Sequence, residues 1–237
     1  MLPETPELIV VLPVYNEQAS IRKVVTEWFQ ELENWTENFV FLVINDGSTD
    51  GTVGMLSRLR ERFGTRLEIL NQENRGHGQT CLRGYGIAVE RGIPFVLQID
   101  SDGQCDSEYF FRFWRMRSNF QVIYGKRIRR DDGWRRVIAS LVLKGVVFAA
   151  CGVWCIDANV PYRLMQTKAI EPALTRIGAD FFLCNVALAV LLRRTAGIAH
   201  GTVPIRFRER YGGEPSVPLG KFGEKAFELI RQLRGLK

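Results

Sequence analysis

The sequence predicts an α/β fold in which a mostly parallel central sheet is flanked by helices. Apolar runs of strand length alternate with amphipathic helical segments through the first half of the chain, which is typical of a parallel sheet covered on both faces. The strand-like runs are nearly continuous Val, Ile and Leu, as in strands buried on both sides. Of the 237 residues 46% are hydrophobic, which is enough for one sizeable core, so we expect a single domain over 1–237.

Each expected element rests on apolar periodicity and on the turn residues around it. Residues 8–16 predict a buried strand, and in residues 17–35 the apolar side chains recur at helical spacing. The other strands of the first half are expected at 39–50, 66–72 and 94–102, and its other helices at 51–63 and 74–92. In the less regular second half we expect a strand at 121–127, helices at 134–152 and 179–195, and a short terminal helix after a basic loop at 206–221.

Polar clusters stand where the strands of the first half end. They comprise residues 13–17, 45–50, 74–78 and 100–106, and we describe all four as polar and rich in Gly or Asp. Ligands bind beyond the carboxyl ends of the strands in sheets of this kind. We therefore expect the four clusters to converge on one edge of the sheet.

Asp100 and Asp102 are two carboxylates one residue apart at the end of a strand-like run. Such a pair can bind Mg²⁺ or Mn²⁺ through hard oxygen ligands, with water and phosphate oxygens filling the other positions. The alternative is an Asx turn that caps the next helix. Asp46, after an earlier strand, can accept from a nucleobase or ribose, although a turn before a helix explains it as well.

The stretch NRGHGQTCLRG (74–84) lacks the spacing of the dinucleotide-binding fingerprint and follows a later strand. Its glycines, including Gly76, can let the backbone approach a pyrophosphate, with His77 or Arg83 supplying positive charge. A plain turn into a helix is the alternative.

The composition narrows the range of partners. A net charge of +6 and a pI of about 9.2 favour nucleotide phosphates, lipid phosphates or an acidic membrane surface, while no nucleic-acid motif is visible. Five widely spaced cysteines indicate neither a disulfide framework nor a zinc site, and they fit a reducing cytoplasm. The N-terminal stretch lacks the basic region of a secretory signal.

The longest apolar tract bears on membrane contact. Residues 137–156 are interrupted by Lys144, so they are a poor candidate for crossing a bilayer and a fair one for lying on it. With the arginines and Trp134 before it, the amphipathic segment 128–156 suits an anionic membrane surface. The alternative is a helix buried in the core and preceded by basic residues that are exposed to solvent.

Five motifs together resemble the family 2 glycosyltransferases of the GT-A fold, in the branch that includes dolichyl-phosphate mannose synthase and bacterial polyprenyl-phosphate glycosyltransferases. They are PVYNE (13–17), NDGSTD (45–50), NRGHGQTCLRG (74–84), DSDGQCD (100–106) and YGKR (124–127), and the match covers most of residues 8–216. The resemblance implies a nucleotide-sugar-binding half at 1–106, an acceptor-binding half at 107–216 and a tail helix at 217–237.

The resemblance, with the residue chemistry above, assigns the candidate site. Donor-binding residues are expected to be Pro13, Tyr15, Glu17, Asp46, Gly76, His77, Arg83, Ser101 and Gln104. Asp100 and Asp102, with Gln104 nearby, would hold Mn²⁺ or Mg²⁺, and Arg127 and Arg210 would face phosphates of the donor or acceptor.

The chain also departs from the family pattern, and the departures bear on the acceptor more than on donor binding. Asn45 stands where Asp is frequent, His77 where Lys is common, Gly103 where Leu is common, and Asn185 where some relatives carry Glu. The loop RYGGEPS has one residue more before Ser216 than the R-x-x-G-x-S signature.

The resemblance implies an inverting, metal-dependent transfer from a UDP- or GDP-sugar to a polyprenyl (dolichyl or undecaprenyl) phosphate, by a cytoplasmic protein peripheral to the inner face of the membrane. A lipid phosphate is already an anion, whereas a hydroxyl acceptor needs a base, for which Asp157 is the first candidate and Asp180 the second. One alternative is transfer to a carbohydrate hydroxyl of a surface polysaccharide or glycolipid. Another is a catalytically silent protein that binds a nucleotide-sugar or a membrane-protein partner.

Overall fold

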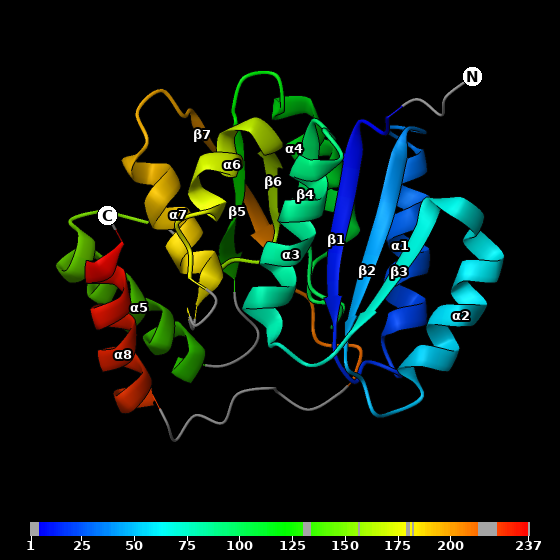
Figure 1. The fold of residues 1–237 in the computed structure, drawn as a ribbon, viewed down its shortest axis with the longest axis horizontal. Helices are drawn as coiled ribbons and strands as arrows, with labels where there is room; N and C mark the ends of the chain where they lie inside the picture. The colour runs from blue at the N-terminus through cyan, green and yellow to red at the C-terminus, as the bar shows by residue number, and fades with distance from the viewer. Residues whose placement is uncertain are drawn as a thin grey trace.

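The computed structural model describes residues 5–129, 134–155, 157–178, 181, 183–212 and 222–236. Within them lies one sheet of seven strands in the order β3-β2-β1-β4-β6-β5-β7 (Figure 1). The strands are β1 Leu8–Val14, β2 Phe39–Asp46, β3 Leu67–Gln72, β4 Phe95–Gln98, β5 Val122–Arg129, β6 Arg163–Gln166 and β7 His200–Arg206. Only β6 runs antiparallel to its neighbours β4 and β5, so the expected mostly parallel sheet is confirmed.

Helices pack on both faces of this sheet. They are α1 Ile21–Glu33, α2 Thr52–Phe63, α3 His77–Glu90, α4 Phe110–Met116, α5 Trp134–Cys151, α6 Thr167–Leu174, α7 Cys184–Arg194 and α8 Phe222–Gly235, with short 3-10 turns η1 Gly64–Arg66 and η2 Ser107–Tyr109. Helices α3, α6 and α7 contact one another on one face, while α1 and α4 lie behind the sheet (Figure 1). Helix α5 packs against α8 at one end of the molecule.

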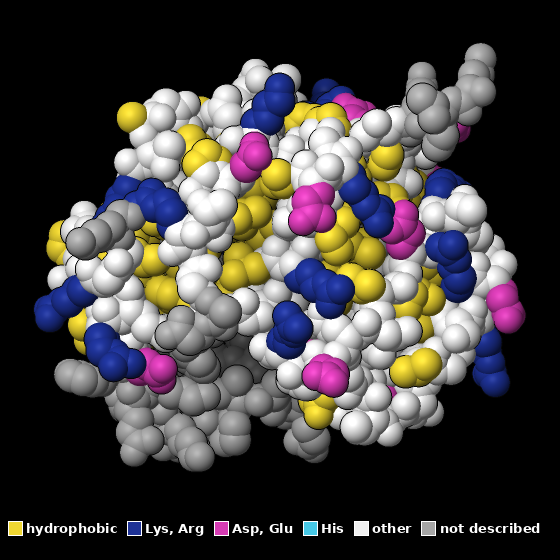
Figure 2. Space-filling view, viewed as in Figure 1, with side chains coloured by type: hydrophobic (Ala, Val, Ile, Leu, Met, Phe, Trp, Pro, Cys, Tyr) yellow, Lys and Arg dark blue, Asp and Glu magenta, His cyan; other side chains and the backbone are white. Residues whose placement is uncertain are grey.

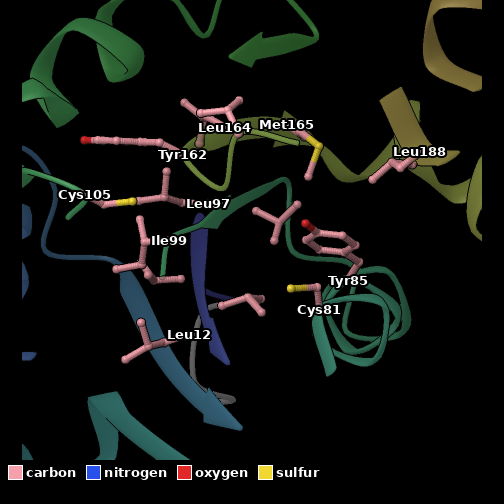
Figure 3. Close-up of a cluster of buried hydrophobic side chains, with 14 of the residues drawn as sticks. Leu12, Cys81, Tyr85, Leu97, Ile99, Cys105, Tyr162, Leu164, Met165 and Leu188 are labelled. Carbon is pink, nitrogen blue, oxygen red and sulfur yellow. The ribbon is translucent and has the colours of Figure 1, made fainter. Parts of the chain in front are cut away.

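The core explains why the first strands read as continuous apolar runs. Every residue of β1 and β2 is buried, because helices cover both faces there. Cys81 and Tyr85 of α3 lie on one side of Leu97, and Cys105 and Tyr162 lie on its other side (Figure 3).

The structure differs from the expected elements in the second half. Strand β6, helix α6 and strand β7 were not expected, and α7 begins at Cys184 rather than near residue 179. Strand β4 ends at Gln98, several residues before the expected end at residue 102. The aspartates therefore lie in a turn beyond the strand. Among the described helices, none combines the length and apolar character that crossing a bilayer requires.

Two glycines of α3 test how closely this helix approaches β1. A Cβ on Gly84 would lie 2.3 Å from Cγ1 of Val11, whereas a Cβ on Gly86 would meet nothing within 4 Å. We expect Gly84→Ala to lower the free energy of unfolding by about 1–3 kcal/mol through overpacking. The control Gly86→Ala should raise it by roughly 0.5–1 kcal/mol, because alanine is the better helix former. Urea unfolding measures both, and equal shifts in the two variants would contradict this packing.

Candidate active site

The four polar clusters meet at one edge of the sheet, where β1, β2 and β3 end at the bottom of Figure 1. The contacts that join them include Asn16 N to Ser48 Oγ at 3.0 Å, Gly76 N to Asp46 Oδ2 at 2.9 Å, and His77 Nε2 to Asp100 Oδ1 at 3.6 Å. The expected convergence is confirmed, since parallel strands bring their carboxyl ends to one side.

The turn after β4 carries two carboxylates, those of Asp100 and Asp102, which differ in their hydrogen-bond partners. Asp102 Oδ1 accepts from the backbone N–H of Gln104 at 3.0 Å, which is an Asx turn, and Oδ2 lies 3.6 Å from Arg210 Nε. Asp100 Oδ1 is buried and has no hydrogen-bond partner among the described residues. Burial and then the neighbouring Asp102 raise the pKa of Asp100, while His77 opposes the rise. The Asx turn is thus confirmed at Asp102, although Asp106 rather than Asp102 caps the following 3-10 turn η2, and metal binding by Asp100 and Asp102 stays a prediction.

These oxygens fit a hard divalent cation. No group of three or more His, Cys, Asp or Glu side chains suited to a metal occurs in the described part of the chain. Two carboxylates are sufficient where water and substrate phosphate complete the coordination, as is usual for Mg²⁺. The side-chain amide of Gln104 donates to the carbonyl of Arg208 at 3.4 Å, so its contact with a metal or ribose stays a prediction. Ser101 is buried within the turn.

His77 places positive charge beside Asp100 at the start of α3. Its side chain is 52% exposed. The sulfur of Cys81 raises the pKa of His77 to about 10, burial opposes that rise, and the carboxylates of Asp100 and Asp102 add to it, which favours the cationic imidazole. No described side chain caps α3, and Gly76 before it has φ +84°, a conformation that suits glycine. A cation at an uncapped helix N-terminus suits an anionic ligand.

Asp46 supports the turn that precedes α3. It is only 3% exposed and accepts from Gln72 Nε2 at 2.6 Å, Arg75 N at 2.8 Å and Gly76 N at 2.9 Å. Arg83 adds to this hydrogen-bond network by donating to Gln72 Oε1 at 2.6 Å. The structure therefore engages both oxygens of Asp46 within the protein, and contact of Asp46 or Arg83 with a donor stays a prediction.

The end of β1 contributes an exposed aromatic ring and a buried acid. Pro13 is buried within β1, and Tyr15 is 45% exposed. Glu17 is 9% exposed and accepts from Ser20 Oγ at 2.5 Å. Burial raises the pKa of Glu17, and Ser20 and Arg210 oppose that rise. An accessible ring beside acidic groups is suited to a nucleoside.

Asp157 pairs with Arg127 of β5 in a bidentate contact. Arg127 Nε lies 2.6 Å from Oδ2 and Nη2 lies 2.5 Å from Oδ1. This places together two residues that the sequence assigned to separate roles. Arg163 does not pair with Asp157, because Arg163 is fully buried and donates to backbone carbonyls of Ala158, Val160 and Asn185. Asp180 and Ser216 lie outside the described residues.

Sequence reasoning missed two residues that shape the site, Arg163 and Tyr211. Arg163 could have been noticed as a lone cation in the otherwise apolar run VPYRLM. The ring of Tyr211 explains the departure at Gly103, because a Cβ on Gly103 would lie 2.4 Å from Tyr211 Cδ2. No local pattern predicts that contact, since the two residues are far apart in the sequence.

Solved structures identify the architecture as that of the GT-A glycosyltransferases. Glucosyl-3-phosphoglycerate synthase from Mycobacterium tuberculosis, in complex with Mn²⁺, UDP and glucosyl-3-phosphoglycerate, is similar with a TM-score of 0.63 and 16% identity, over 96% of this chain and 78% of that one. A structure described as a mycobacterial protein has a TM-score of 0.67 and 17% identity, over 96% and 73%.

The chain belongs to glycosyl transferase family 2, whose sequence profile matches residues 9–168. The undecaprenyl-phosphate 4-deoxy-4-formamido-L-arabinose transferase of Edwardsiella ictaluri (strain 93-146) is 26% identical over 222 residues, which are 93% of this chain and 66% of that protein. The transferase of the same name from Aeromonas hydrophila subsp. hydrophila is 28% identical over 166 residues, 70% of this chain and 50% of that protein. The chain thus spans just under two thirds of the first of these relatives.

Proposed function

We propose that this protein transfers a sugar from a nucleotide-diphospho-sugar to a polyprenyl phosphate, with inversion at the sugar carbon. The observation that carries the proposal is the meeting of Asp100 and Asp102 with the cations His77 and Arg210 at one edge of the sheet. The names of the curated relatives, which specify undecaprenyl phosphate, support the acceptor.

The chemistry follows from where charge develops. The departing nucleoside diphosphate gains negative charge, which His77, Arg210 and the N-terminus of α3 would stabilise. A Mn²⁺ or Mg²⁺ ion held by Asp100 and Asp102 would supply Lewis-acid stabilisation of the same charge. The exposed ring of Tyr15 is suited to stacking on the base of the donor.

The pairing of Arg127 with Asp157 favours a phosphate acceptor. A hydroxyl acceptor needs a carboxylate free to take its proton, and both oxygens of Asp157 accept from Arg127. A phosphate acceptor instead needs a guanidinium held in a fixed orientation, which this bidentate pair supplies. In this scheme residues 1–106 bind the donor, 107–216 the acceptor, and 217–237 form a tail.

The end of the molecule formed by α5 and α8 suits contact with an anionic membrane. Val142, Phe148 and Trp154 are 54%, 52% and 61% exposed, and the rings of Phe148 and Trp154 lie 5.9 Å apart. Figure 2 shows hydrophobic side chains beside Lys and Arg at its left edge, on the side of α5 and α8. Exposed aromatic and aliphatic groups beside basic residues are typical of proteins on the membrane surface. We infer a peripheral position on the cytoplasmic face, where the lipid acceptor would be reached.

Two measurements in sequence separate the candidate functions. A thermal-shift panel of UDP- and GDP-sugars first identifies the donor, since a ligand that binds the folded state raises the melting temperature. Release of the nucleotide is then measured with Mn²⁺ and either undecaprenyl phosphate or undecaprenol. We expect undecaprenyl phosphate, but not undecaprenol, to raise the rate of nucleotide release about a hundredfold, because a bound acceptor is positioned for the reaction. Release with glycan acceptors only would indicate a hydroxyl acceptor, and tight binding without turnover a silent protein.

A further inference from the structure

Residues 207–212, which we call the strap, follow β7 and run along the turn after β4. Arg208 N donates to Gln104 O at 3.1 Å, and Tyr211 N donates to Asp102 O at 3.0 Å. The side chain of Gln104 adds a third hydrogen bond, to Arg208 O at 3.4 Å. The backbone of the strap is therefore paired with the turn that carries the candidate metal ligands.

Tyr211 fastens the strap to α1. Its hydroxyl donates to the carboxylate of Glu27, with oxygen distances of 2.8 and 3.1 Å, and Lys23 Nζ lies 3.7 Å from the centre of its ring. Glu27 also accepts from Arg208 Nη2 at 2.9 Å. Gly103, with φ +83°, leaves the space that the ring fills. Residues on both sides of position 210 are thus held to the body of the protein.

Arg210 lies between two carboxylates without a close hydrogen bond to either. Its Nη2 is 3.4 Å from Glu17 Oε1, and its Nε is 3.6 Å from Asp102 Oδ2. The buried Nε has no hydrogen-bond partner in the described part of the protein. A charge-assisted hydrogen bond is usually about 2.7–2.9 Å long, so these contacts are loose. Arg210 neutralises both acids and is still free to exchange partners.

We propose that Arg210 is an exchangeable counter-ion, which neutralises Asp102 and Glu17 before ligands bind, releases Asp102 to a divalent cation, and turns to the diphosphate of the donor while Tyr211 keeps it within reach. This inference deepens the proposed function and rests on it. Without a diphosphate, Arg210 and the metal compete for Asp102. With a diphosphate present, Arg210 has a new partner, so metal and nucleotide bind better together than either does alone, and this coupling is reciprocal.

The test is a titration of the full chain with Mn²⁺, followed by the electron paramagnetic resonance signal of the free ion, with and without UDP and, in a second series, GDP. We expect Arg210→Gln to bind Mn²⁺ alone about tenfold more tightly than the wild type, a change within the usual range of coupling between sites. The same variant should lose most of the tightening that the diphosphate produces in the wild type. Binding of Mn²⁺ alone that is no tighter in Arg210→Gln would overturn the inference.

Tyr211→Phe tests the positioning role, since it removes only the hydroxyl that reaches Glu27. We expect a normal melting temperature and a smaller loss of Mn²⁺–diphosphate coupling than in Arg210→Gln. Tyr109→Phe, a tyrosine near the same loop but outside the strap, should keep full coupling, and equal coupling in both tyrosine variants would contradict the role of Tyr211. Asp102→Asn separates the two proposals. If Asp102→Asn loses Mn²⁺ binding while Arg210→Gln binds Mn²⁺ as the wild type does, only the counter-ion inference fails. If Asp102→Asn binds Mn²⁺ as tightly as the wild type, the assignment of the metal site fails as well.

Discussion

Asp102→Asn is expected to lower the rate of sugar transfer by about a hundredfold to a thousandfold, the range seen when one preorganised electrostatic contact is lost. The change removes one of two carboxylate charges that face the candidate cation site. Asparagine keeps a side-chain oxygen that can accept from Gln104 N, as Asp102 Oδ1 does, so the turn should persist. Nucleotide release per folded molecule and the melting temperature measure the two effects separately.

Glu108→Gln is the matched control for this change. It removes the same charge from an exposed position a few residues further along the same loop. We expect its rate to stay within about twofold of the wild type, because the charge of an exposed side chain is largely screened by solvent and salt. If Asp102→Asn instead unfolds the protein while activity per folded molecule is unchanged, the carboxylate is structural and the metal assignment is lost.

Arg163→Met is expected to lower the free energy of unfolding by about 3–5 kcal/mol, as when a buried, hydrogen-bonded charge network is broken. Arg163 is fully buried, and its guanidinium donates to Ala158 O at 3.2 Å and Asn185 O at 3.2 Å, while its Nε donates to Val160 O at 3.0 Å. Methionine fills much of the same volume but leaves these three carbonyls without their donor. The loop that begins beside Asp157 depends on these hydrogen bonds.

Arg176→Met is the control, since Arg176 is exposed in the turn that follows α6. Its free energy of unfolding should change by less than about 0.5 kcal/mol, as for most surface substitutions. Urea unfolding of both variants checks the prediction. Equal stability of the two would mean that the guanidinium of Arg163 is not needed to hold the loop.

The predicted elements with the strongest local signal were found where the sequence placed them. β1 and β2 were predictable because a strand covered on both faces must be apolar at every position. Strand β6 was not, because its four residues include the buried Arg163 and are too few for a periodic pattern. Strand β7 contains Pro204 and, among the described strands, pairs only with β5, and such an edge position tolerates proline, which weakens the strand signal.

The sequence by itself determined the class of fold and the chemistry available at the ends of β1, β2 and β4, because apolar periodicity and turn residues act over a few neighbouring positions. Only the tertiary structure decided how those groups are paired. Arg127 binds Asp157 from 30 positions away, and Arg210 reaches Glu17 across 193. Such contacts depend on the order of strands in the sheet and on the path of the strap, and neither leaves a local pattern in the residues that meet.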